Sequence, residues 1–119
     1  MHSQVAWRDS LAEGEAEASR RNGLVFVTFD AAWCEPCRKL NHDVFSDPTV
    51  GRALSGLAPV KLNYDKPGNR RLFEELGGVG LPAYFLVRSD GTVAARGGGM
   101  VAPQEFLAWL RDALRNAGR

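Results

Sequence analysis

The stretch Leu24 to Leu40, LVFVTFDAAWCEPCRKL, decides the fold that the sequence predicts. Residues 24–29 are almost continuously apolar and rich in β-formers, which is typical of a strand buried on both faces of a sheet. From Cys34 the spacing becomes helical, and it puts Cys37, Leu40 and Val44 on one face. We therefore expect a central strand that leads directly into a helix carrying both cysteines of the chain.

The rest of the chain alternates between helical and strand patterns. We expect further helices over residues 7–21, 48–55, 69–76 and 103–116, and strands over 59–64, 81–87 and 92–96. The turn Ser89-Asp90-Gly91 makes the last two strands antiparallel, and Gly97-Gly98-Gly99 is predicted as a bend before the last helix. That helix is expected to point Phe106, Leu107, Leu110, Ala113 and Leu114 inward. The order predicts an α/β fold, a three-layer α/β/α sandwich with a mixed central sheet of about four strands.

The length and charge of the chain limit its partners. We expect 119 residues to form a single domain, with residues 1–23 as an N-terminal peripheral helix and 24–119 as the core. The net charge of +1 comes from 15 basic and 14 acidic residues spread along the chain. This distribution argues against a nucleic-acid partner or a surface for anionic membranes, and we expect a monomer.

The sequence shows no targeting signal that would identify a cellular compartment. No apolar run approaches the roughly 20 residues that a transmembrane helix needs, and Met1 to Arg20 lacks the pattern of a signal peptide. Two interpretations stay open: a cytoplasmic protein, or an exported or membrane-tethered protein whose targeting segment lies outside this sequence.

Cys34 and Cys37 have the spacing of a redox-active dithiol. A thiolate is the nucleophile in disulfide exchange, and Cys34 at a helix N-terminus faces unpaired amides that stabilise negative charge. Cys37 lies one turn deeper, so we expect Cys34 to attack and Cys37 to resolve. Pro36 is tolerated in the first helical turn. Glu35 opposes the thiolate and raises the pKa of Cys34, which predicts a reductant rather than a strong oxidant.

The alternative is that Cys34 and Cys37 supply two of the ligands of a metal site. A zinc site needs about four ligands, and the only histidines, His2 and His42, are not at partner spacing. We therefore expect no metal and no cofactor.

Several motifs carry a resemblance to a known family. They are Trp33-Cys34-Glu35-Pro36-Cys37 with its preceding strand, Lys61-Leu62-Asn63-Tyr64-Asp65, and Gly80-Leu81-Pro82. From Leu24 onward the chain resembles the thioredoxin superfamily. The insert over residues 44–50 and the Gly-Leu-Pro are most similar to the C-terminal thioredoxin-like domain of the DsbD family of thiol:disulfide interchange proteins.

The resemblance implies a function and a site. It implies electron relay from a membrane-embedded domain to disulfide-containing proteins of the periplasm, through transient mixed disulfides. It also implies a cis peptide bond before Pro82, which turns the Leu81 backbone toward Cys34 to pair with an extended substrate segment. Trp33 is expected to shield one side of the site.

Two positions depart from the family pattern. The buried acid that thioredoxins carry in the strand before the motif is replaced by Thr28, and the second acid of the DsbD domain falls on Asn41. Glu35, Asp30 or water are the alternatives for handling the proton of Cys37.

Two classes of function remain in competition. The leading hypothesis is a thiol:disulfide oxidoreductase that works as a reductase or electron relay. The alternatives are a thioredoxin-fold binding or metal-chaperone module, and an oxidase or isomerase with the same dithiol.

Overall fold

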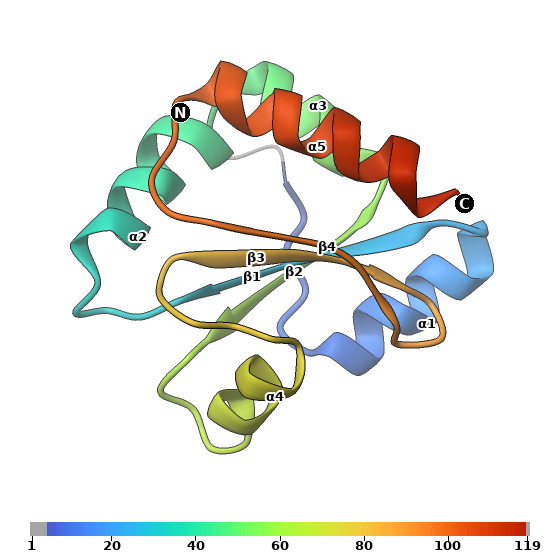
Figure 1. Ribbon diagram of the computed structural model, residues 1–119, viewed down its shortest axis with the longest axis horizontal. Helices are drawn as coiled ribbons and strands as arrows, with labels where there is room; N and C mark the ends of the chain where they lie inside the picture. Colours follow the sequence, from blue (N-terminus) through green and yellow to red (C-terminus); the bar gives the residue numbers. More distant parts are fainter. Residues whose placement is uncertain (1–4, 119) are drawn as a thin grey trace.

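Four strands form one mixed sheet with helices on both faces in the structure, a computed structural model that describes residues 5–118. Figure 1 shows α2, α3 and α5 over one face of the sheet and α1 and α4 over the other. The predicted three-layer α/β/α sandwich is therefore confirmed. In chain order the elements are α1 (Leu11–Arg21), β1 (Leu24–Asp30), α2 (Glu35–Leu40), η1 (Asn41–Phe45), α3 (Pro48–Ser55), β2 (Ala58–Asn63), α4 (Asn69–Glu75), β3 (Ala83–Arg88), β4 (Val93–Gly98) and α5 (Pro103–Ala117).

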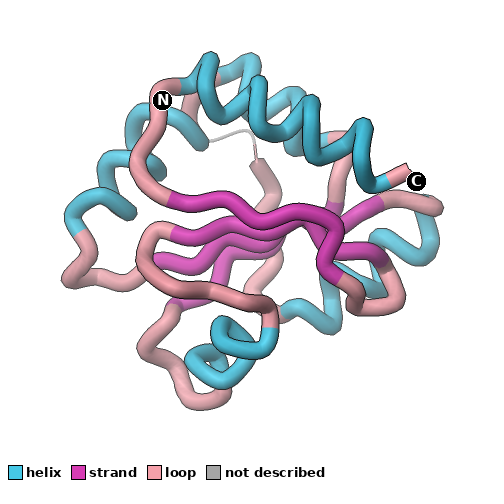
Figure 2. Tube along the Cα trace, viewed as in Figure 1, coloured by secondary structure: helices cyan, strands magenta, loops and turns pink. Residues whose placement is uncertain are grey.

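The strand order β2-β1-β3-β4 places β1 inside the sheet (Figure 2). β1 pairs in parallel with β2 and antiparallel with β3, and β4 pairs antiparallel with β3, as the turn at Ser89 to Gly91 predicted. Five of the seven residues of β1 are buried. This burial on both faces explains why the segment is almost continuously apolar.

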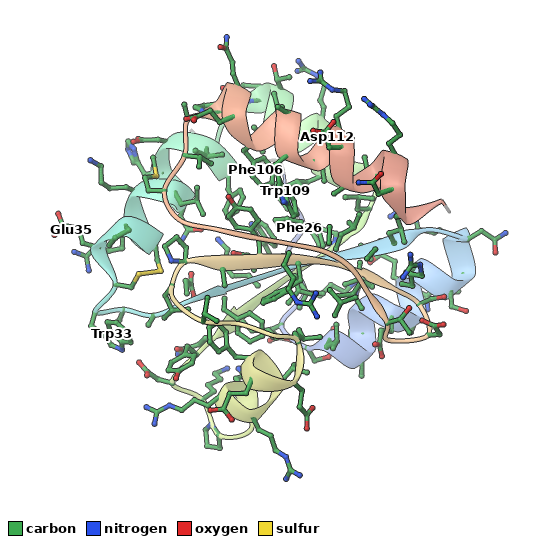
Figure 3. All side chains as sticks on the ribbon, viewed as in Figure 1. Phe26, Trp33, Glu35, Phe106, Trp109 and Asp112 are labelled. Atoms are coloured by element: carbon green, nitrogen blue, oxygen red, sulfur yellow. A yellow bond between two sulfur atoms is a disulfide. The ribbon has the colours of Figure 1, made fainter. Side chains whose placement is uncertain are left out.

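The two faces of β1 enter two separate parts of the core. On one face Phe26 packs among aromatic rings from α5 and η1, and its ring centroid lies 5.5 Å from that of Phe106 and 5.9 Å from that of Phe45. Figure 3 shows Phe26, Phe106 and Trp109 gathered between α5 and the sheet. On the other face Phe29 lies 5.3 Å from Phe73 of α4. The alternation of side chains along one strand therefore fastens helices to both sides of the sheet.

The first helix begins later than predicted, because Trp7 does not belong to it. Ser10 is the N-cap, and its hydroxyl accepts a hydrogen bond from the Glu13 amide at 3.1 Å. The residues before it are extended beside β2, where the Arg8 amide donates to the Pro59 carbonyl at 2.9 Å. The Trp7 ring packs 5.3 Å from Phe45. The free edge of β2 and the aromatic core together hold this segment out of the helix.

The helix predicted to continue from Cys37 through Val44 changes its winding. It is an α-helix only to Leu40, and a π-helical turn, η1, follows over residues 41–45. The extra residue in this turn lets both Val44 and Phe45 face the core, where each is at most 2% exposed.

Two predictions near the C-terminus were wrong. Gly97 and Gly98 belong to β4 rather than to a bend, because they pair with Tyr84 and Ala83 of β3. A Cβ on Gly97 would lie only 2.8 Å from the Trp109 ring, so the close packing of α5 on this strand requires glycine there. Leu114 was expected to face inward, yet it is 38% exposed. The buried side of α5 is the narrower stripe of Phe106, Leu110 and Ala113.

Gly14 offers a test of how closely α1 packs on the sheet. A Cβ at this position would overlap Val60 Cγ2 of β2. Alanine normally favours a helix interior over glycine by about 1 kcal/mol, but here we expect Gly14→Ala to lower the free energy of unfolding by about 1–3 kcal/mol. Urea denaturation would measure this, with Gly56→Ala as the control because its Cβ meets no atom closer than 3.7 Å. Equal stability of Gly14→Ala and the wild-type protein would contradict the packing described here.

Candidate active site

Cys34 and Cys37 form a disulfide at the N-terminal end of α2, after the loop that follows β1, and their Cα atoms are 5.3 Å apart. Cys34 is the N-cap of α2, and its Sγ accepts a hydrogen bond from the Cys37 amide at 3.2 Å. A sulfur in this position gains stabilisation of negative charge when the disulfide is opened. Cys34 is 4% exposed and Cys37 only 1%, so the outer sulfur is the one that a partner reaches first.

Trp33 flanks the disulfide, and a hydrogen bond to the loop after β2 holds its side chain in place. Its indole is 64% exposed, yet Nε1 donates a hydrogen bond to Asp65 Oδ2 at 2.9 Å. Arg70 binds the other carboxylate oxygen of Asp65 at 3.4 Å and lies over the Tyr64 ring. Figure 3 shows Trp33 and Glu35 close to the disulfide, at the outer end of α2.

Leu81 and Pro82 complete the site from the start of β3. The peptide bond between them is cis, as predicted. Leu81 packs against the small cluster formed by Ala31, Cys34 and Cys37. The fold therefore brings the two sequence motifs together, although Leu81 lies 44 positions after Cys37 in the chain.

Thr28, which replaces the buried acid of the family pattern, has a structural role. Thr28 is 2% exposed, and its hydroxyl donates to the carbonyl of Ala83 at 3.2 Å. This bond ties β1 to β3 directly after Pro82. Burying this hydroxyl without a hydrogen-bond partner would cost free energy. The Thr28 hydroxyl is therefore committed to the bond with Ala83.

Asp30 supplies a carboxylate on the same side of the sheet. It lies two residues after Thr28, so the two side chains share a face of β1. Asp30 Oδ2 accepts a hydrogen bond from Asn41 Nδ2 at 3.1 Å, and Asn41 lies one turn after Cys37. Lys61 is opposite Thr28 in β2. Burial lowers the pKa of Lys61, and the charge of Asp30 acts in the opposite direction.

The residues considered for metal binding do not come together. Across residues 5–118, no three His, Cys, Asp or Glu side chains are grouped so that they would hold a metal ion. His42 is exposed and contacts Asp43 at 2.7 Å, while His2 lies outside the described residues. No helix within the same range is long and apolar enough to cross a membrane.

Sequence reasoning missed two of the supporting contacts. Asp65 was identified only as the end of the Lys61 to Asp65 motif, and nothing local indicates that it binds Trp33 across 32 positions. Asp30 and Asn41 were identified separately, but their hydrogen bond depends on how α2 packs on β1. Neither pairing leaves a signal in the spacing of residues.

The strand order, the disulfide at the start of α2 and the adjacent cis proline define a thioredoxin fold. A thioredoxin from Thermus thermophilus superposes with a TM-score of 0.85 at 27% identity, covering 97% of this chain and 91% of that one. The oxidised C-terminal domain of Neisseria meningitidis DsbD gives a TM-score of 0.77 at 23% identity, covering 91% of this chain and 99% of that domain.

The chain belongs to the thioredoxin-like domain family, whose sequence profile matches residues 11–114. Among its relatives is the thiol:disulfide interchange protein DsbD of Klebsiella pneumoniae, which is 31% identical over 108 residues, or 87% of this chain. The resemblance to thioredoxins and DsbD is thus confirmed. The chain spans only 15–18% of the length of the DsbD relatives that it matches. Family membership and the closed disulfide together support disulfide oxidoreductase activity.

The hydrogen bond between Trp33 and Asp65 predicts how open the site is. Asp65→Ala frees the indole, and we expect iodoacetamide to alkylate reduced Cys34 about two- to fivefold faster, as the loss of one net hydrogen bond of about 1 kcal/mol implies. Asp65→Asn keeps an acceptor oxygen and should react like the wild-type protein. If Asp65→Ala and wild type react at the same rate, the bond does not shield Cys34.

Proposed function

We propose that residues 1–119 act as one thiol:disulfide oxidoreductase domain that reduces protein disulfides or relays electrons to them. The observation that carries this proposal is the position of the Cys34–Cys37 disulfide, at the N-terminus of α2 and against Leu81 of the cis-proline loop. This arrangement places a reactive sulfur beside backbone that a protein substrate can pair with.

The proposed reaction has two exchange steps. In the reduced protein the Cys34 thiolate attacks one sulfur of the substrate disulfide, and the other substrate sulfur leaves as a thiolate. Cys37 then loses its proton and attacks Cys34 Sγ, which releases the second substrate thiolate. The protein ends with the disulfide seen in the structure, and two electrons have passed to the substrate. The deeper burial of Cys37 supports this division of roles.

We assign the proton of Cys37 to Asp30 rather than to Glu35. The Asp30 carboxylate lies on the face of β1 that α2 covers, and Asn41 fixes it one turn from Cys37. Lys61 provides a positive charge near this carboxylate. Glu35 is exposed at the outer end of α2, where it influences the charge around Cys34 instead.

The substrate is proposed to bind along the cis-proline loop. An extended segment would pair with the Leu81 backbone, while Trp33 and Val79, which are 64% and 100% exposed, offer apolar surface on either side. Exposed apolar side chains around a reactive group are typical of a protein-binding surface.

The names of the relatives support a proposal for the direction of electron flow and for the compartment. Several matching proteins are named DsbD, thiol:disulfide interchange protein. By analogy, we propose a periplasmic reductase that receives electrons from a membrane-embedded donor. Glu35 between the cysteines favours the reductant over an oxidase or isomerase, because its charge disfavours the thiolate of the reduced form.

A monothiol variant tests the catalytic roles. We expect Cys37→Ser to accumulate a mixed disulfide with insulin through Cys34, since the resolving thiol is gone. Cys34→Ser is the matched control and should accumulate little. Non-reducing electrophoresis and mass spectrometry of the adduct would measure both. Absence of an adduct with Cys37→Ser would instead favour a binding or metal-chaperone module.

The pH dependence tests the role of Asp30. We expect Asp30→Asn to slow the resolving step about tenfold or more near pH 7, because the variant lacks a carboxylate to accept the proton. The deficit should shrink as pH rises past the ordinary thiol pKa of about 8.5, where solvent removes the proton. Rapid-quench kinetics of the mixed disulfide would follow this step. Glu35→Gln serves as control, and a deficit in that variant with none in Asp30→Asn would reverse our assignment.

A further inference from the structure

A groove of about 370 Å³ extends from the active site along the sheet. One wall is the loop over residues 77–82, the other is the end of β4 from Arg96 to Gly99, and Ala83 and Phe85 lie between them. Leu81 belongs both to this groove and to the cluster around the disulfide. The groove is therefore continuous with the surface on which exchange takes place.

Two of the glycines that line this groove leave it open to an extended chain. Six of its lining residues lack a side chain: Gly77, Gly78, Gly80, Gly97, Gly98 and Gly99. At Gly80 and Gly99 an added Cβ would meet no atom within 4 Å, so the space above the backbone is free. Val79 stands fully exposed in the same wall. Exposed backbone with little side-chain obstruction suits a peptide segment.

Among residues 5–118, Arg96 is the one charged residue that lines the groove. Its Nε donates to the Leu76 carbonyl at 2.9 Å, and the guanidinium lies beside Gly77. This bond holds the group in place, and within residues 5–118 its terminal amino groups have neither a hydrogen-bond acceptor nor an ion-pair partner. A positioned guanidinium of this kind is suited to bind a carboxylate.

We propose that Arg96 selects, among the substrate segments that lie in this groove, those that carry a carboxylate close to the disulfide cysteine. The proposal rests on the function proposed above. Ala83 faces Gly98 and Phe85 faces Arg96 in the sheet, so Arg96 lies two positions beyond the start of β3. Two residues of a strand span about 7 Å, which is the distance along the sheet from the start of β3 to Arg96. A substrate carboxylate that binds Arg96 would therefore lie about two to four residues from the substrate cysteine.

Capped nonapeptides with one cysteine in disulfide linkage to nitrothiobenzoate would test this selection. A single Glu is placed two, three or four residues before or after the cysteine, and Gln replaces it in the matched peptide. We expect the reduced protein to react with the best Glu peptide about three- to fivefold faster than with its Gln partner, the range of an exposed ion pair. This ratio should fall toward one at high salt.

Variants separate charge recognition from loop support. Arg96→Gln should abolish the preference for Glu, Arg96→Lys should retain most of it, and Arg111→Gln on the exposed side of α5 should match the wild-type protein. A preference that survives in Arg96→Gln would overturn the proposal. So would an equal slowing of all peptides, which would mean that Arg96 only supports the loop at Leu76.

A binding measurement separates this proposal from the proposed function. The same peptides with serine in place of cysteine are titrated against the oxidised protein by fluorescence anisotropy. Tighter binding of the Glu peptide without any reduction of the disulfide peptides would support the groove and contradict the oxidoreductase function. Equal binding of the Glu and Gln peptides would overturn the role of Arg96, whatever the exchange rates.

Discussion

The antiparallel register between β1 and β3 is the constraint on which the active site depends. Phe29 faces Ala83, so the end of β1 that leads to Cys34 meets the start of β3 that follows Pro82. The hydroxyl of Thr28 reinforces this register by binding the Ala83 carbonyl. A slip of one residue would turn the apolar side chains of β1 to the wrong faces of the sheet, and both parts of the core oppose it. The same packing that stabilises the fold therefore holds the two halves of the site together.

Much of this arrangement could be predicted from the sequence, because its determinants are local or periodic. The apolar run of β1 and the Ser89 to Gly91 turn each specify one element through the residues of that segment alone. Trp7 was assigned to the wrong element because its position depends on the edge of β2 and on the Phe45 ring, which are distant in the chain.

The supporting groups of the site were harder to predict for the same reason. Asp30 reaches Asn41 only because α2 crosses that face of β1, and Arg96 reaches the Leu76 carbonyl only because β4 runs beside the loop. Such contacts join side chains whose types are ordinary at their own positions. The sequence identified Asp30 as one of several candidates for the proton of Cys37, and its hydrogen bond to Asn41 is the reason that we propose it over Glu35.

We propose that Cys34 and Cys37 form a reducing dithiol, and their redox potential tests this role most directly. The protein would be equilibrated with glutathione buffers of known composition, and its dithiol fraction measured by alkylation and mass spectrometry. We predict a potential more negative than about −220 mV, in the range of thioredoxins and glutaredoxins. A potential near about −120 mV, that of a strong disulfide oxidant, would contradict the account.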